Sequence, residues 1–207
     1  MSRVVKFPQS TPSKFGYKKA TVKRGRKKVN LEDFGQLNMF DQASEAKVIN
    51  LKPNMASFEE ALLMDEQGHS EKAIDLYNRA INGKENIADS YCNIGVIYSQ
   101  KKEHSKAIDA FTRGLKADPR HFEAHYNLAN LFSDIGNIPL AKVHYQMSVT
   151  INPEFSNGYY NLGLILATNR EYEEAIDAFV KYKETAPADE KENAMELIRN
   201  INQSIVS

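Results

Sequence analysis

The 207-residue chain has no net charge at pH 7, because 27 Lys and Arg residues balance 27 Asp and Glu residues. Its 42% hydrophobic and 26% charged residues are typical of a soluble globular protein, and no run approaches the roughly 20 consecutive apolar residues that cross a membrane. The single cysteine excludes an intrachain disulfide framework. We therefore expect a cytoplasmic protein, with a nuclear or organellar address in the basic N-terminus left open.

The N-terminal quarter of the chain differs in charge from the rest. Residues 1–50 contain eleven Lys or Arg and four Asp or Glu, a charge of +7, whereas residues 51–207 carry −7. This N-terminal arm is basic, is interrupted by Pro and Gly, and is too polar to fold alone, so we expect it to be mostly disordered. Its candidate regulatory or nucleic-acid-binding cations are Lys18, Lys19, Lys23, Arg24, Arg26, Lys27 and Lys28.

A short apolar motif follows the basic cluster. The sequence QLNMF at 36–40 resembles the bacterial sliding-clamp-binding pentapeptide, in which a glutamine forms hydrogen bonds and apolar side chains fill pockets. The residues that would do this are Gln36, Leu37, Met39 and Phe40. We favour the alternative that residues 31–42 form a short helix that docks on the first repeat of the body. Its docking residues would be Leu31, Phe34, Leu37 and Phe40.

The body of the chain repeats with a period of 34 residues. Asp118-Pro119, Asn152-Pro153 and Ala186-Pro187 recur at that interval. Each unit also has a small residue in its first half, at Ala61, Gly95, Ala129 and Gly163. Its second half has an alanine followed four residues later by an aromatic residue, at Ala73/Tyr77, Ala107/Phe111, Ala141/Tyr145 and Ala175/Phe179. This pattern therefore predicts that each unit forms two helices, which cross closely where their side chains are small.

This pattern resembles the tetratricopeptide repeat, which has the same period and the same Leu-Gly, Ala, aromatic and Pro positions. The resemblance covers residues 54–187 and implies an all-α fold, a right-handed superhelical α-solenoid. We expect four units at 54–87, 88–121, 122–155 and 156–189. After them, Met195, Ile198, Ile201 and Ile205 recur at helical spacing and predict a capping helix over 190–207.

The family resemblance also implies where a ligand would bind. In this family the first helix of each unit lines a concave groove, and equivalent positions here hold an asparagine in three successive units. This row is similar to the asparagine ladder of the O-linked N-acetylglucosamine transferase superhelix, although the catalytic domain of that protein is absent here. The candidate peptide-binding residues are Asn93, Asn127, Asn161, Tyr126, Tyr160, Asp89, Glu123, Asn130, Asp134 and Leu164.

The groove positions favour a non-catalytic scaffold that binds an extended peptide. A row of primary amides offers donors and acceptors to a peptide backbone, and the groove acids Asp89, Glu123 and Asp134 favour a basic or neutral ligand over an anion. The basic arm is then a candidate competitor for the groove. The alternative is a nucleic-acid-associated adaptor that uses the arm and QLNMF. We expect no cofactor, metal or enzymatic activity, because His121 and His125 lack a third ligand and no phosphate loop or nucleophile motif occurs.

Overall fold

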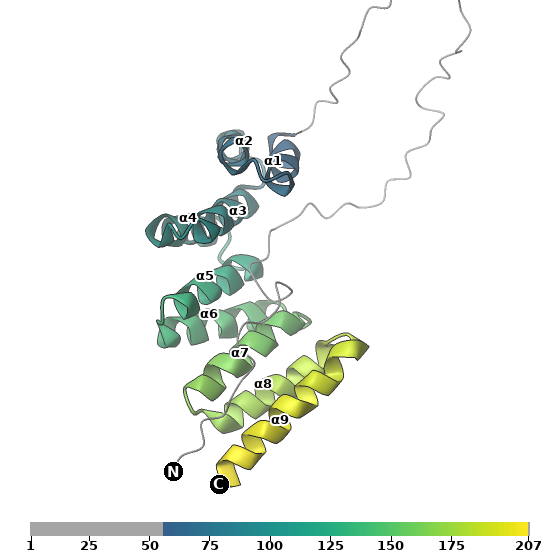
Figure 1. The fold of residues 1–207 in the computed structure, drawn as a ribbon. Coiled ribbons are helices and arrows are strands. Elements are labelled where there is room, and N and C mark those ends of the chain that lie inside the picture. The colour runs from purple at the N-terminus through teal and green to yellow at the C-terminus, as the bar shows by residue number, and fades with distance from the viewer. Residues whose placement is uncertain (1–55, 207) are drawn as a thin grey trace, which may run out of the picture.

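The computed structural model describes residues 56–206, and within them the chain forms nine α-helices and one 3-10 turn without a strand (Figure 1). The helices are α1 (Ser57–Glu66), α2 (Ser70–Asn82), α3 (Ile87–Gln100), α4 (His104–Ala117), α5 (Phe122–Asp134), α6 (Ile138–Ile151), α7 (Ser156–Thr168), α8 (Tyr172–Thr185) and α9 (Lys191–Val206). The 3-10 turn η3 (Ala188–Glu190) lies between α8 and α9. The expectations for the basic arm, for QLNMF and for a helix over 31–42 lie outside the described residues.

Successive helices pack as hairpins that stack in chain order. The pairs are α1/α2, α3/α4, α5/α6 and α7/α8, and α9 packs on α8 at the end of the stack (Figure 1). Each hairpin also contacts the next one, through α2 and α3, α4 and α5, and α6 and α7. The prediction of an all-α, right-handed superhelical solenoid is confirmed. No helix in the part of the chain that the structure describes combines the length and the apolar character of a membrane span.

The turn inside each hairpin has the same backbone geometry in all four units. A residue with positive φ occurs every 34 residues, at Gly68 (80°), Lys102 (62°), Gly136 (77°) and Arg170 (65°). The next residue donates its N–H to the carbonyl of the residue five positions earlier, as in the bond from Asn137 to Phe132 (2.7 Å), which is a Schellman C-cap. Glycine adopts this conformation without strain, whereas a side chain costs about 1 kcal/mol or more.

The turn between hairpins ends the preceding helix in two ways. A proline follows the residue that terminates α4, α6 and α8, and its missing N–H stops each helix. The first unit has Glu85 at that position. There α2 ends through a positive φ angle at Lys84 (59°), and Asn86, the N-cap of α3, also has a positive φ angle (42°). The Glu85 N–H bonds the Ala80 carbonyl at 2.8 Å. The first unit therefore closes its second helix although it lacks the proline.

The core lies where the two helices of each hairpin cross. A methyl group added at Gly95 would lie 2.6 Å from the Phe111 ring, and one at Gly163 would lie 2.7 Å from the Phe179 ring. Such distances are far below van der Waals contact, so these positions require glycine for the present ring positions. At the end of the stack, Ala194, Leu197 and Ile201 of α9 are buried against the fourth hairpin. Ile205, in the last turn of α9, is about half exposed.

Candidate functional site

The predicted asparagine row links consecutive hairpins. Asn93, Asn127 and Asn161 lie on α3, α5 and α7, and their exposed fractions are 0%, 0% and 9%. Each side-chain amide donates to a side chain of the preceding unit. The three bonds run from Asn93 Nδ2 to Tyr77 Oη (3.2 Å), from Asn127 Nδ2 to Cys92 Sγ (3.3 Å) and from Asn161 Nδ2 to Tyr126 Oη (3.1 Å). The row therefore fixes the spacing of neighbouring hairpins.

The two predicted contact tyrosines also pack inside the solenoid. Tyr126 makes an edge-to-face contact with Phe155 at 4.9 Å between ring centroids, and Tyr160 contacts Tyr182 in the same way at 5.1 Å. Both are fully or almost fully buried. Asn130 is buried as well, and its Oδ1 accepts bonds from Tyr145 Oη (2.6 Å) and from the Asn161 amide (3.0 Å). These contacts give the three residues a clear structural role.

The remaining predicted residues reach the surface to different degrees. Asp134 is exposed, the side chains of Asp89 and Glu123 are 36% and 24% exposed, and Leu164 is half-buried. Asp89 and Glu123 lie in the first turns of α3 and α5, one repeat apart. The accessible part of the predicted site is therefore mainly acidic.

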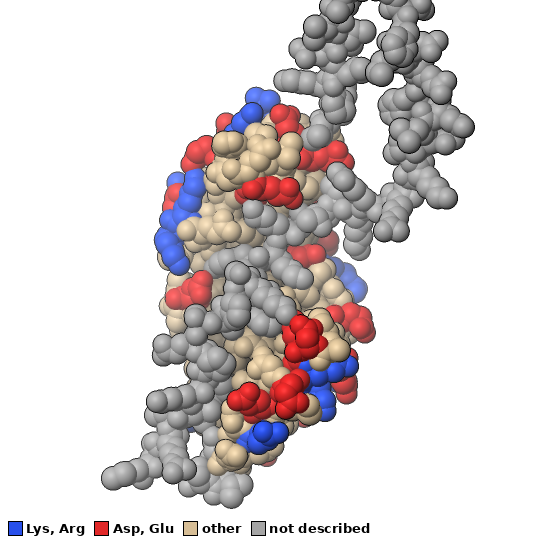
Figure 2. Space-filling view, turned by 45° about the vertical axis from the view of Figure 1, so that its right-hand side comes forward, with Lys and Arg blue, Asp and Glu red and all other residues tan. Residues whose placement is uncertain are grey.

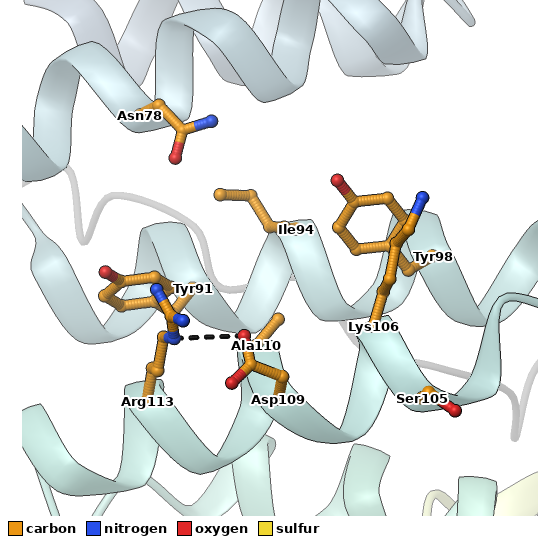
Figure 3. A pocket seen from close by; sticks show the side chains of 9 residues that line it. All are labelled: Asn78, Tyr91, Ile94, Tyr98, Ser105, Lys106, Asp109, Ala110 and Arg113. Carbon is orange, nitrogen blue, oxygen red and sulfur yellow. Dashed lines mark ion pairs between the residues drawn. The ribbon is translucent and has the colours of Figure 1, made fainter.

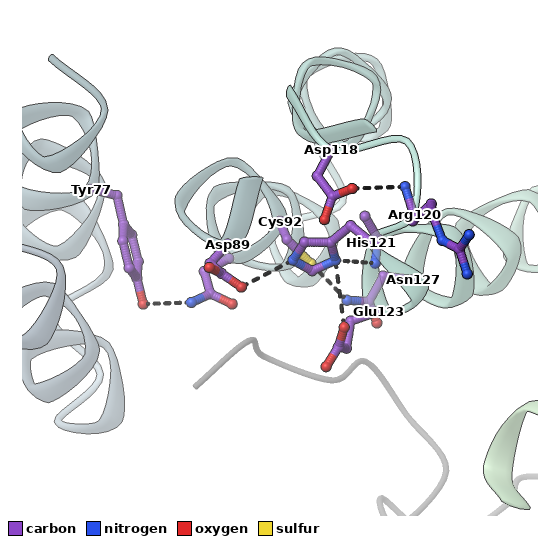
Figure 4. A network of polar contacts seen from close by, with 10 residues as sticks. Tyr77, Asp89, Cys92, Asp118, Arg120, His121, Glu123 and Asn127 are labelled. Carbon is purple, nitrogen blue, oxygen red and sulfur yellow. Dashed lines mark hydrogen bonds and ion pairs between the residues drawn. The ribbon is translucent and has the colours of Figure 1, made fainter. Parts of the chain in front are cut away.

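Asp89 and Glu123 flank His121, and we call these three residues the His121 cluster (Figure 4). His121 is the N-cap of α5, and its Nδ1 accepts the Ala124 N–H at 3.1 Å. Because Nδ1 is then an acceptor, Nε2 carries the proton of the neutral ring and donates to Asp89 Oδ1 at 3.1 Å. Glu123 Oε2 lies 3.5 Å from Nδ1. Sequence reasoning missed this role of His121, although a polar residue directly before a predicted helix is an N-cap signal.

The electrostatics of the His121 cluster favour positive charge. Burial acts to lower the pKa of His121, but the hydrogen bond to Asp89 and the negative charges of Glu123, Asp89 and Asp118 outweigh it, so the pKa is raised. Protonation would place a cation between two carboxylates, at the expense of the N-cap bond.

His125, four residues later, has different partners from those of His121. Its Nε2 lies 3.2 Å from the Pro119 carbonyl and must donate to it, so the Nδ1 of the neutral ring accepts. The group that faces this Nδ1 at 3.0 Å is Nδ1 of His144, which therefore donates. Burial lowers the pKa of His125, and burial together with the charge of His125 lowers the pKa of His144 to about 4. The two rings form a neutral pair within the third unit, in which His125 is buried and His144 is partly exposed.

A cavity of about 330 Å³ lies between the first two units, away from the predicted residues (Figure 3). Its walls include the rings of Tyr91 and Tyr98, and the Lys106 ammonium lies 5.3 Å from the Tyr98 ring centroid. The second cation, Arg113, pairs with Asp109 through Nε and Oδ2 at 3.0 Å. Because Lys106 also pairs with an acid next to its own helix, the cavity has little net charge for an anion.

Nothing in residues 56–206 groups three His, Cys, Asp or Glu side chains closely enough to hold a metal ion. Cys92 is fully buried in an apolar cluster, and burial raises the pKa of its thiol. It therefore lacks the thiolate character of a reactive cysteine.

Comparisons with known proteins agree with this geometry. Family models described as the tetratricopeptide repeat match residues 88–121 and residues 144–177. The chain contains tetratricopeptide repeats. The first match coincides with the second unit, and the second match begins within α6 and ends within α8, so it covers one period in a different phase.

Solved structures with the same fold have low sequence identity to this chain. The structure of YrrB, described as a tetratricopeptide-repeat protein with an unusual peptide-binding site, is 23% identical with a TM-score of 0.56, over 78% of this chain and 93% of that one. The structure of MamA is 19% identical with a TM-score of 0.55, over 70% of this chain and 94% of that one. The first tetratricopeptide domain of Spaghetti (RPAP3), bound to the HSP90 peptide SRMEEVD, is 23% identical with a TM-score of 0.53, over 58% of this chain and 94% of that one. The search of curated proteins finds no match.

Proposed function

We propose that this repeat protein is a non-catalytic scaffold that binds an extended, basic or neutral peptide segment of a partner protein. Two solved structures of the same fold support the general role, because their descriptions name a peptide-binding site and a bound peptide. Stacked helical hairpins present a long continuous surface, which suits an extended chain better than a compact ligand.

The observation that carries the proposal is the His121 cluster. Asp89 and Glu123 come from two successive hairpins and remain accessible on either side of a buried imidazole. A carboxylate accepts charge-assisted hydrogen bonds from Lys or Arg, which are shorter and stronger than neutral ones. Two such acceptors one repeat apart would hold one cationic side chain of a peptide and repel an anionic one.

This preference is opposite to that of a tetratricopeptide domain that binds an acidic peptide. The peptide SRMEEVD bound by the Spaghetti domain carries three acidic residues and one arginine. In this chain the accessible residues of the predicted groove include Asp89 and Glu123, whose negative charge would repel an acidic peptide. We therefore assign it a different class of ligand.

The asparagine row receives a positioning role in this proposal. Because Asn93, Asn127 and Asn161 are buried and bonded to the preceding unit, they set the distance between successive hairpins. Replacing them by alanine would remove buried hydrogen bonds and disturb the fold, at about 1–3 kcal/mol for each group left unsatisfied. The accessible acids give a cleaner test of binding.

The test uses isosteric, neutral replacements in the cluster. A fluorescently labelled basic peptide with the sequence of residues 17–30 is titrated with the protein, and anisotropy is measured. Asp89→Asn combined with Glu123→Gln should weaken binding roughly tenfold, which corresponds to about 1.4 kcal/mol. Asp177→Asn with Glu173→Gln, two exposed acids of α8, is the matched control and should leave the affinity unchanged. Equal affinities of the wild-type and cluster variants would refute the assignment.

The basic arm is proposed as a competitor for the same groove. It is part of the same chain, so its effective concentration near the groove is about millimolar. Deletion of residues 1–30 should then raise the affinity for the labelled peptide. An affinity that does not change at low salt would refute this competition.

The second candidate function is a nucleic-acid-associated adaptor, favoured by the seven clustered cations between Lys18 and Lys28. If six of the cations met phosphates, the affinity for duplex DNA would fall with salt at a log–log slope of about −5. In that case deletion of residues 1–30 would abolish DNA binding, whereas the Asp89 and Glu123 variant would bind normally.

A further inference from the structure

The face of α6 that points away from the core is apolar and exposed. Leu140, Val143 and Met147 follow one another along this face, and their exposed fractions are 40%, 50% and 42%. Ile135, in the turn directly before α6, is 44% exposed. We call these four residues the α6 stripe. They make up four of the seven large apolar residues that are exposed among those the structure describes.

The repeat itself shows that this stripe is unusual. The three α6 positions hold Lys72, Asp75 and Arg79 in the first unit, Lys106, Asp109 and Arg113 in the second, and Glu174, Asp177 and Lys181 in the fourth. All nine are charged and exposed. The position of Ile135 likewise holds a polar residue in every other unit, namely Gln67, Lys101 and Asn169. The fold therefore accepts charged side chains at these positions. Packing within the solenoid does not require the apolar residues of the third unit, and such an exposed apolar patch indicates a contact with another segment or molecule.

The small area of the α6 stripe limits which kind of binding partner can cover it. Four side chains, each exposed by about half or less, offer much less than the roughly 800 Å² per partner that a stable complex buries. A second copy of the chain held by this stripe alone would dissociate at ordinary concentrations. A segment of the same chain needs much less area, because a tether gives it an effective concentration of about millimolar.

One segment outside the described residues has matching chemistry. Residues 31–40 contain Leu31, Phe34, Leu37 and Phe40, and no cation. The fifteen residues from 41 to 55 connect this segment to the first described residue and span up to about 50 Å when extended. Neighbouring helices pack about 10 Å apart, and α6 belongs to the third hairpin of the stack, two hairpins after α1 (Figure 1). The extended length of residues 41–55 is therefore enough to bring residues 31–40 to α6.

We propose that residues 31–40 dock on the α6 stripe of the same molecule, with their apolar side chains against Leu140, Val143 and Met147. The first unit is a weaker site for this segment, because Leu63 is the one large apolar residue exposed on α1 and α2. Docking would also hold the basic residues 18–28 close to the body, which links this surface to the arm without depending on the proposed peptide site. The charged surface of the helical body is seen in Figure 2, where acidic and basic side chains lie among uncharged ones.

The test uses a tryptophan reporter in the full-length chain. The protein has no tryptophan, so Phe34→Trp reports on this segment alone. In the otherwise wild-type chain we expect blue-shifted emission and quenching by acrylamide that is several-fold weaker than for a free indole. Leu140→Lys with Val143→Asp and Met147→Arg gives α6 the residues of the second unit, and should shift the emission to the red and restore full quenching. Glu174→Lys with Asp177→Lys on α8 is the control and should change neither.

A second variant protects the test against a fold defect in α6. Leu31→Asp with Leu37→Asp alters only the segment, and should expose the reporter indole to the same extent while circular dichroism stays unchanged. The proposal is overturned if the indole is fully quenched in the wild-type background, or if charging the α6 stripe leaves its environment unchanged. It is also overturned if the blue shift disappears on dilution in step with dimer dissociation in sedimentation, because the occupant is then a second copy.

Discussion

Gly95→Ala should destabilise the solenoid, although alanine is the better helix former. Gly95 lies in α3, and an added Cβ would lie 2.6 Å from Cδ1 and Cε1 of Phe111 on α4. Carbon atoms pack favourably at about 3.5–4.0 Å, so the overlap is about 1 Å against a ring that is itself fully buried. Overpacking of this kind costs about 1–3 kcal/mol, and the gain from replacing a helical glycine is at most about 1 kcal/mol. We expect a net loss of about 1–2 kcal/mol.

Urea denaturation followed by circular dichroism measures this loss, provided that the slope with denaturant is the same for both proteins. Gly83→Ala is the matched control, because a Cβ there meets its nearest atom at 3.4 Å and the backbone φ is −76°. That variant should be neutral or slightly more stable. In a Phe111→Leu background the cost of Gly95→Ala should fall, since the two side chains are in contact. A Gly95→Ala protein that is as stable as the wild type would refute the reasoning and show that the Phe111 ring moves at little cost.

Three further predictions concern buried or partly buried groups. The pKa of His144 is lowered to about 4, so this residue contributes stability above the unfolded pKa of about 6.5, and that stability is lost as the pH falls toward 4. Replacing His144 by leucine, the residue of the first unit at this position, should make the free energy of unfolding less dependent on pH, by about 1–2 kcal/mol in acid titrations. The expected value is below the full linkage value because His144 is partly exposed. Cys92 is fully buried and its thiol pKa is raised, so it should react with a thiol reagent only at the rate of unfolding, and fast labelling of the native protein would contradict its placement. Tyr182 Oη donates to the buried Glu190 at 2.7 Å, so Tyr182→Phe should lower the unfolding free energy measured in urea by about 1–3 kcal/mol. The double variant Tyr182→Phe with Glu190→Gln should regain part of this lost stability, because it no longer leaves a buried carboxylate without its donor.

Local rules explain why the helices were predictable. The 34-residue period, the small residues at Gly95 and Gly163 and the proline after α4, α6 and α8 each act through nearby backbone geometry or through the partner helix of the same hairpin. Even the turns repeat, because a residue with positive φ is required at the same point of each hairpin. Such contacts are close in sequence, so a pattern in the sequence is enough to indicate them.

The candidate site was less predictable, because it depends on contacts between hairpins. The sequence placed Asn127 and Tyr126 on the correct helix, but their burial and their bonds follow from how closely α5 packs on its neighbours. Similarly, His121 and His125 are four residues apart, yet one caps α5 beside Asp89 and the other pairs with His144. Sequence spacing gives the helix face, whereas side-chain reach and packing distance give the partner.

The amino-acid sequence by itself determined the type of repeat, the number of its units and the acidic residues in the first turns of α3 and α5. Only the tertiary structure decided which of those residues are open to solvent, and that the apolar face of α6 is left uncovered by its neighbours among the described residues. The reason is physical: helix formation follows from interactions within a few residues, whereas exposure is a property of the whole stack and exists only after the hairpins have packed.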